Sequence, residues 1–173
     1  MKVLKTVAII LGVLIGTFVI YNASIDPHYE VDRTIDIASS PAEVSAVVSD
    51  FKTWPNWSTW FERDSTMTAS FTDNTSGIGA SYSWTSEHSG SGSMEILAYA
   101  AEEKMTTSIV FDGMGASTGN WTFEATDSGT KVTWGFSGEM PFFFRFMAPN
   151  MEQAVAPDFE AGLKNLKELI EQG

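Results

Sequence analysis

Residues able to carry out chemistry are few and scattered in this sequence of 173 residues. The absence of cysteine excludes disulfides, thiolate metal sites and a cysteine nucleophile. His28 follows Pro27, His88 lies in a polar loop, and neither has a second histidine at a metal-ligand spacing. Glu87 and His88 could form an acid–base pair, but no third group completes a catalytic set. We therefore expect no metal and no cofactor, assign no catalytic residue, and favour a protein that is not an enzyme.

Phosphate-containing partners are also disfavoured. Gly77-Ile78-Gly79 and Gly90-Ser91-Gly92 look like short phosphate loops, but neither continues as a dinucleotide fingerprint or precedes a helical pattern. Both are interpreted as turns. Ten Lys and Arg against 22 Asp and Glu give a formal net charge of −12, whereas a nucleic-acid-binding face needs an excess of basic side chains. We expect no nucleic-acid partner, and the pattern does not identify a protein partner.

The N-terminus is predicted to cross a membrane. Lys2 and Lys5 precede Thr6–Tyr21, a run without charge that would span about 24 Å as a helix. With the two preceding apolar residues, the segment 3–21 approaches the ~20 residues that a single transmembrane helix needs. The two lysines should stay in the cytoplasm, which places the rest of the chain on the extracytoplasmic side.

These features divide the chain into an anchor over residues 1–22, a linker over 23–30 and one domain over 31–173. A cleaved signal peptide is the alternative, and the domain would then be secreted. Cleavage requires small residues in an A-x-A-like pattern, but Tyr21-Asn22-Ala23 has a bulky tyrosine in that pattern. A retained anchor is therefore favoured.

The domain begins with signals for a strand, a helix and then a sheet. Val31–Ile37 alternates apolar and polar residues, which predicts a half-buried strand, and Ser40 with Glu43 matches a helix capping box. Alternating segments then continue from residue 67 to 136, and Asp127–Thr130 predicts a hairpin turn between the last two. Short turns between successive strands predict an antiparallel meander with one apolar face.

The chain ends with an amphipathic pattern from about Met151 to Glu171. Its apolar stripe consists of Phe159, Leu163, Leu166 and Ile170. Burial of four such side chains would contribute roughly 6–12 kcal/mol before the entropy cost. We expect this helix to cover the apolar face of the sheet.

Several segments in this order resemble the SRPBCC superfamily, in particular its START-like polyketide cyclase/dehydrase group. The resemblance is carried by Val31–Ile37, Ser40–Val44, Asp50–Trp57, Gly77–Trp84, Gly129–Trp134 and Phe159–Lys167. It implies an α+β helix-grip fold: an antiparallel sheet wrapped around a long C-terminal helix, here preceded by one N-terminal transmembrane helix. It also implies an apolar cavity. The superfamily includes carriers, receptors, cyclases and co-chaperone-like modules, so the resemblance leaves the function open.

Strand alternation predicts which side chains face that cavity. The candidates on strands are Tyr82, Trp84, Thr107, Ile109, Phe111, Trp121, Phe123, Trp134 and Phe136. Trp57, and Phe159 and Leu163 of the final helix, are further candidates. Glu95, Glu124 and Lys131 have the opposite parity, so we expect almost no acid or base inside. Such a wall is typical of a binding site and offers little for acid–base catalysis. Alternatively, the aromatic side chains fill the core and leave no void.

The aromatic run Pro141–Met147 has three interpretations: a gate of the cavity, an anchor in the membrane interface, or a segment packed on the sheet edge. We favour packing on the sheet edge. For the whole chain, the leading hypothesis is a membrane-tethered protein that binds a hydrophobic small molecule or lipid. The alternatives are a polyketide cyclase/dehydratase-like enzyme and a protein-interaction module with a filled core.

Overall fold

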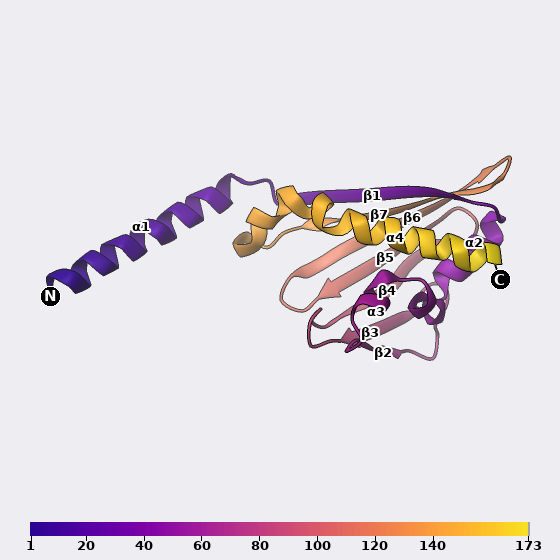
Figure 1. The fold of residues 1–173 in the computed structure, drawn as a ribbon, viewed down its shortest axis with the longest axis horizontal. Coiled ribbons are helices and arrows are strands. Elements are labelled where there is room, and N and C mark those ends of the chain that lie inside the picture. The colour runs from indigo at the N-terminus through magenta and orange to yellow at the C-terminus, as the bar shows by residue number, and fades with distance from the viewer. Residues whose placement is uncertain (173) are drawn as a thin grey trace.

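In the computed structural model, which describes residues 1–172, one curved antiparallel sheet wraps around a long C-terminal helix (Figure 1). Among these residues the sheet has seven strands, in the spatial order β1-β7-β6-β5-β4-β3-β2. The strands are β1 (His28–Ile37), β2 (Thr68–Phe71), β3 (Ser81–Thr85), β4 (Gly92–Ala100), β5 (Lys104–Phe111), β6 (Gly115–Thr126) and β7 (Gly129–Glu139). The predicted α+β helix-grip fold is confirmed.

Helix α1 projects from the body, and the remaining helices belong to the body itself (Figure 1). The helices are α1 (Lys2–Ser24), α2 (Pro41–Ser49), η1 (Phe51–Asn56), α3 (Thr59–Arg63), η2 (Phe142–Asn150) and α4 (Met151–Gln172), where η denotes a 3-10 helix. Figure 1 shows α4 lying along the sheet, with α1 pointing away from the body. The sheet and α4 therefore form the two walls between which a site can lie.

The start of α2 follows the predicted capping box. The Ser40 hydroxyl accepts a hydrogen bond from the Glu43 N–H (3.3 Å), and a Glu43 carboxylate oxygen accepts one from the Ser40 N–H (3.1 Å). Hydrogen bonds from Ser39 and from Ser40 lower the pKa of Glu43. Two of the free N–H groups at this helix end are thereby satisfied by local sequence alone.

A block of aromatic rings fills the part of the core below the middle of α4. The Trp134 ring stacks on Trp121 (centroids 4.6 Å apart, 17° between planes) and on Phe159 (4.0 Å, 5°). Trp54 and Trp57 meet these rings edge-on. A Cβ at Gly162 would lie 3.2 Å from the Trp134 ring, so glycine lets α4 approach the sheet closely here. The space between the sheet and this part of α4 is therefore filled by side chains.

The connection between α1 and the domain is short. α1 continues to Ser24 and β1 already begins at His28, so the predicted linker of residues 23–30 is mostly helix and strand. By length and composition α1 could cross a membrane, and among its residues only Asn22 is buried.

The aromatic run contacts the sheet edge at β1, as favoured, and it also reaches α1. It forms η2, which lies against the last turns of α1, with Phe18 and Phe146 ring centroids 6.4 Å apart. Phe143, Phe144, Phe146 and Met147 stay exposed. The run leads directly from the end of β7 into α4.

Candidate functional site

A cavity of about 370 Å³ lies between the sheet, α3 and the N-terminal half of α4. Its wall is mostly apolar. The lining residues are Tyr29, Trp60, Phe61, Met67, Tyr82, Trp84, Ser89, Phe111, Met114, Ser117, Phe136, Glu139, Met140, Met147, Met151, Ala154, Val155 and Asp158. The volume falls within the range of ~300–1,000 Å³ that is common for small-molecule sites.

Four of the predicted cavity residues line this space: Tyr82, Trp84, Phe111 and Phe136. Tyr82 and Trp84 point inward from β3 because two-residue alternation places them on the same face. Burial raises the pKa of the Tyr82 phenol well above its ordinary value, so this hydroxyl is neutral and can donate a hydrogen bond.

The other eight predicted residues lie elsewhere in the core. Trp57, Thr107, Ile109, Trp121, Phe123, Trp134, Phe159 and Leu163 are all buried on the inner side, but they do not line the cavity. The five of them on strands, Thr107, Ile109, Trp121, Phe123 and Trp134, point inward as their parity predicts. They are separated from the cavity because the stacked rings around Trp134 fill the grip from sheet to helix. Both predicted alternatives, an open and a filled core, thus occur at opposite ends of one domain.

Methionines were missed as cavity residues. Five of them line it: Met67, Met114, Met140, Met147 and Met151. Most stand just outside a strand or at a helix end, where a two-residue alternation carries no information. Because the thioether side chain is unbranched and flexible, such a wall can adapt to ligands of different shape.

A buried pair of hydroxyl groups belongs to the mostly apolar wall. The Tyr29 and Ser117 hydroxyl oxygens lie 2.6 Å apart, across Gly138, which pairs with Tyr29 on one side and with Ser117 on the other. A Cβ at Gly138 would lie 2.5 Å from the Tyr29 hydroxyl oxygen, so only glycine leaves room for this pair. Burial raises the Tyr29 pKa, and the neutral pair offers one remaining O–H donor together with acceptor lone pairs to a ligand.

Two carboxylates line the cavity, which corrects the expectation that almost no acid would face it. Asp158 comes from α4 and forms an ion pair with Arg63, while Glu139 ends β7 and lies 3.5 Å from His28. Strand parity missed them because one is helical and the other is the last residue of its strand. Within residues 1–172, no group of three or more His, Cys, Asp or Glu is arranged to hold a metal ion.

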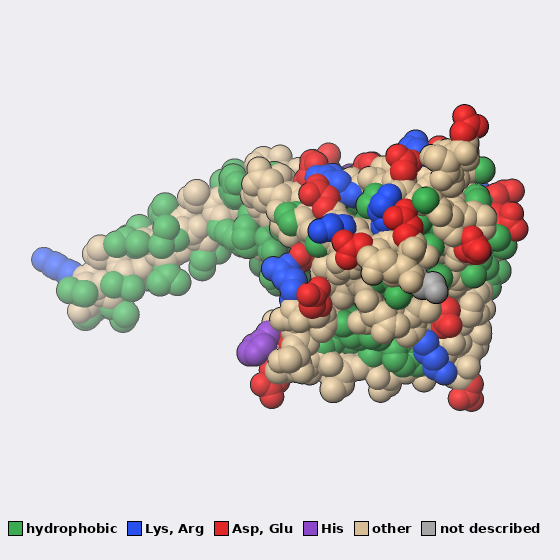
Figure 2. Space-filling view, turned by 45° about the vertical axis from the view of Figure 1, so that its right-hand side comes forward, with side chains coloured by type: hydrophobic (Ala, Val, Ile, Leu, Met, Phe, Trp, Pro, Cys, Tyr) green, Lys and Arg blue, Asp and Glu red, His purple; other side chains and the backbone are tan. Residues whose placement is uncertain are grey.

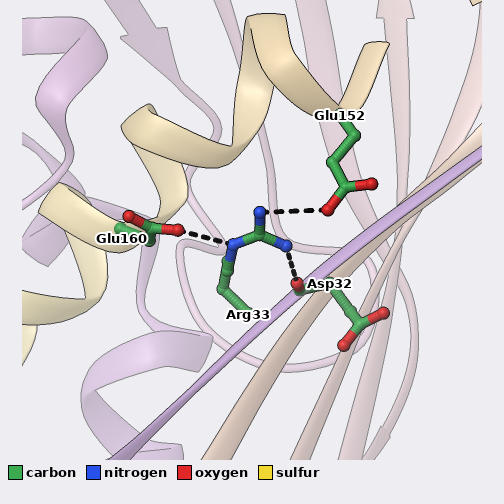
Figure 3. Close-up of polar contacts among 4 residues, drawn as sticks. All are labelled: Asp32, Arg33, Glu152 and Glu160. Carbon is green, nitrogen blue, oxygen red and sulfur yellow. Dashed lines mark hydrogen bonds and ion pairs between the residues drawn. The ribbon is translucent and has the colours of Figure 1, made fainter. Parts of the chain in front are cut away.

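Arg33 fastens the cavity end of α4 to the sheet (Figure 3). From β1, its guanidinium donates hydrogen bonds to Glu160 (2.7 Å) and Glu152 (3.2 Å), and also to the Asp32 carbonyl oxygen (2.6 Å). The hydrogen bond to Glu160 is the main reason that the pKa of Arg33 is raised. Between the two clamped carboxylates lie Ala154, Val155 and Asp158, which line the cavity.

Asp64 holds the loop between β3 and β4 against the end of α3. Its carboxylate accepts hydrogen bonds from the Ser86, Ser89 (2.6 Å) and Thr66 (2.6 Å) hydroxyls. These bonds, with Ser86 contributing most, hold the pKa of Asp64 well below its usual range. Since Ser89 lines the cavity, the ionised Asp64 fixes one side of the wall.

Comparison with known proteins supports this architecture. The sequence model of the family described as polyketide cyclase / dehydrase and lipid transport matches residues 28–171. Comparison with curated protein sequences gives no match.

Solved structures share the fold at low sequence identity. A Staphylococcus aureus protein of unknown function superposes with a TM-score of 0.66 at 13% identity, covering 85% of this chain and 96% of the other. A Chromobacterium violaceum protein gives 0.61 at 14% identity, with 82% and 96% covered. A Thalictrum norcoclaurine synthase mutant, solved with a transition-state analogue, gives 0.62 at 12% identity, with 84% and 95% covered. At such identities the likeness shows the fold alone.

Proposed function

Since the chain belongs to the polyketide cyclase / dehydrase and lipid transport family, we propose that it binds a hydrophobic small molecule or lipid in the cavity beside α4, held at a membrane by α1. The observation that carries this proposal is the wall itself, which consists mainly of aromatic rings and methionines, with a buried hydroxyl pair and two carboxylates as its polar groups. Each methylene of a ligand that leaves water for such a wall gains about 0.8 kcal/mol.

The polar pair restricts the ligand further. The Tyr29 and Ser117 hydroxyls, on β1 and β6, are buried in the cavity wall. They can serve as hydrogen-bond partners for one hydroxyl or carbonyl group of an otherwise apolar ligand. An apolar ligand with one such group would satisfy the donor that this pair leaves free. The methionines would adapt to the rest of the molecule.

The tether is supported by how α1 ends. The Asn22 side chain accepts a hydrogen bond from the Phe146 N–H (3.2 Å) and donates one to the Phe18 carbonyl oxygen (3.0 Å). Cleavage after residue 23 would remove the acceptor on which that N–H depends. We therefore favour a retained single-pass anchor with Lys2 and Lys5 in the cytoplasm and the domain outside; secretion after cleavage is the alternative.

Native mass spectrometry of the full chain, extracted with a mild detergent, tests the proposal. The protein should carry a co-purified apolar molecule. Val155→Trp places an indole at the cavity wall and should abolish the extra mass, while Leu169→Trp, on the same helix but outside the cavity, should keep it. Equal masses for wild type and both variants, without any adduct, would refute the proposal.

A cyclase/dehydratase-like enzyme is the second candidate, favoured by one observation: the Asp158 carboxylate lines the cavity together with the Tyr29 and Tyr82 phenols. A positioned carboxylate can act as an acid or base. Asp158→Asn distinguishes the two functions, because a binding protein should carry the same molecule in both forms. An enzyme should instead accumulate a molecule of different mass, the unconverted substrate, in the variant.

A further inference from the structure

An exposed apolar patch lies on η2. Phe143 is 67% exposed, and Phe144, Phe146 and Met147 are 38%, 43% and 38% exposed. Within residues 1–172, the other exposed large hydrophobic side chains outside α1 and its preceding Met1 come from separate elements: Ile78, Leu97, Val110 and Leu169. Scattered apolar side chains are ordinary, whereas a contiguous patch marks a site of interaction.

The patch is continuous with the apolar surface of α1. η2 packs on the last turns of this helix, where the Phe18 and Phe146 ring centroids are 6.4 Å apart and Asn22 is fully buried. Figure 2 shows hydrophobic side chains along α1 that continue onto the body where the helix joins it. If α1 spans the bilayer, η2 lies at the depth of its last turns, which is the membrane interface.

The polar groups of this junction suit that depth. Asn22 has both its donor and its acceptor satisfied by Phe18 and Phe146. Arg145, the cation within η2, stands 5.4 Å above the Phe142 ring and forms no ion pair among residues 1–172. A cation next to an apolar patch can interact with lipid phosphates, while the aromatic side chains around it enter the interface.

The same segment forms one rim of the cavity. Met147 belongs to the exposed patch and also lines the cavity, and Met140 and Met151, which flank η2, line it too. The side of the cavity formed by these methionines therefore faces the surface that continues from α1.

We infer that η2 inserts into the lipid–water interface and holds the methionine rim of the cavity against the bilayer. The occupant of the exposed patch is the bilayer surface itself. An apolar ligand then passes between bilayer and cavity through this rim without crossing water. The inference rests on the membrane tether of the proposed function, because only an inserted α1 brings η2 to this depth.

The absence of native cysteines allows a direct test on the full chain. Single cysteines are introduced as Phe143→Cys and Met147→Cys in the patch, Val13→Cys within α1, and Ser128→Cys in the exposed β6–β7 turn at the opposite end of β7 from η2. Each is labelled with an environment-sensitive nitrobenzoxadiazole dye and reconstituted into phosphatidylcholine vesicles, with and without lipids that carry a nitroxide quencher near the headgroup.

We expect blue-shifted nitrobenzoxadiazole emission and strong nitroxide quenching for labels at residues 143 and 147. The label at residue 128 should give an aqueous, unquenched signal. An aqueous signal at 143 or 147 with a lipid-buried signal at 13 would overturn the docking of η2 and leave the tether intact. An aqueous signal at 13 would instead refute the tether, and with it this inference. Unchanged tryptophan emission of each labelled protein shows that the domain remains folded.

Discussion

Gly138→Ala is the sharpest test of the polar pair in the cavity. The new Cβ would lie 2.5 Å from the Tyr29 hydroxyl oxygen, 2.9 Å from its Cζ atom and 3.3 Å from the Ser117 hydroxyl oxygen. The ring of Tyr29 must move, which breaks its hydrogen bond to Ser117. Overpacking costs roughly 1–3 kcal/mol, and the lost hydrogen bond adds about 1 kcal/mol. We expect the free energy of unfolding to fall by roughly 2–4 kcal/mol.

Gly135→Ala is the matched control, three residues earlier on the same strand. Its Cβ would meet the Asn120 carbonyl oxygen at 3.6 Å, an ordinary contact. Replacement of a strand glycine by alanine reduces the entropy of the unfolded chain, so this variant should be stabilised by roughly 0.5 kcal/mol.

Thermal unfolding of the full chain in one detergent, followed by far-ultraviolet circular dichroism, measures the difference. For a domain of this size the midpoint of Gly138→Ala should fall by roughly 5–15 °C. Adding Tyr29→Phe should recover part of the loss, because it removes the oxygen at 2.5 Å but leaves the ring carbon at 2.9 Å. Equal midpoints for Gly138→Ala and Gly135→Ala would refute the close packing of Tyr29, Gly138 and Ser117.

Three further predictions concern the core, the loop and the ligand. Trp134→Ala removes the centre of the ring stack and should lower the free energy of unfolding in urea by roughly 3–5 kcal/mol. The loss should exceed that of Trp84→Ala, because the Trp84 ring faces the cavity. A smaller loss for Trp134→Ala would contradict the filled core around it. Asp64 has a folded pKa below its unfolded value, so its contribution to stability is present above about pH 4 and is lost as the pH falls through the folded pKa. Asp64→Asn should therefore lower the melting midpoint at about pH 7, and the difference from wild type should shrink below about pH 4; a difference independent of pH would exclude the ionised carboxylate as the cause. Tyr29→Phe should weaken retention of the co-purified ligand by roughly fivefold, the equivalent of about 1 kcal/mol, in native mass spectrometry; unchanged occupancy would show that the ligand does not use the polar pair.

Local patterns in the sequence were sufficient for the framework of the fold. The capping box at Ser40 and Glu43, the alternation along the strands and the amphipathic stripe of the last helix each express an interaction between residues close in the chain. The order of β3 to β7 follows because short turns force antiparallel neighbours, whereas the pairing of β1 with β7 joins segments distant in sequence. On the strands, the same alternation distinguished the side chains that point inward from those that face solvent.

The position of the cavity along the grip was decided by the tertiary structure. Parity tells which face a side chain points to, but not how far the opposite helix lies from it. That distance depends on contacts such as Gly162 against Trp134, which closes one end, and on Gly138, which makes room for Tyr29 and Ser117 at the other. The rim carboxylates, the methionine wall and the contact between η2 and α1 likewise join residues distant in sequence. Such contacts exist only once the chain is folded, since no periodic pattern encodes the distance between two packed elements.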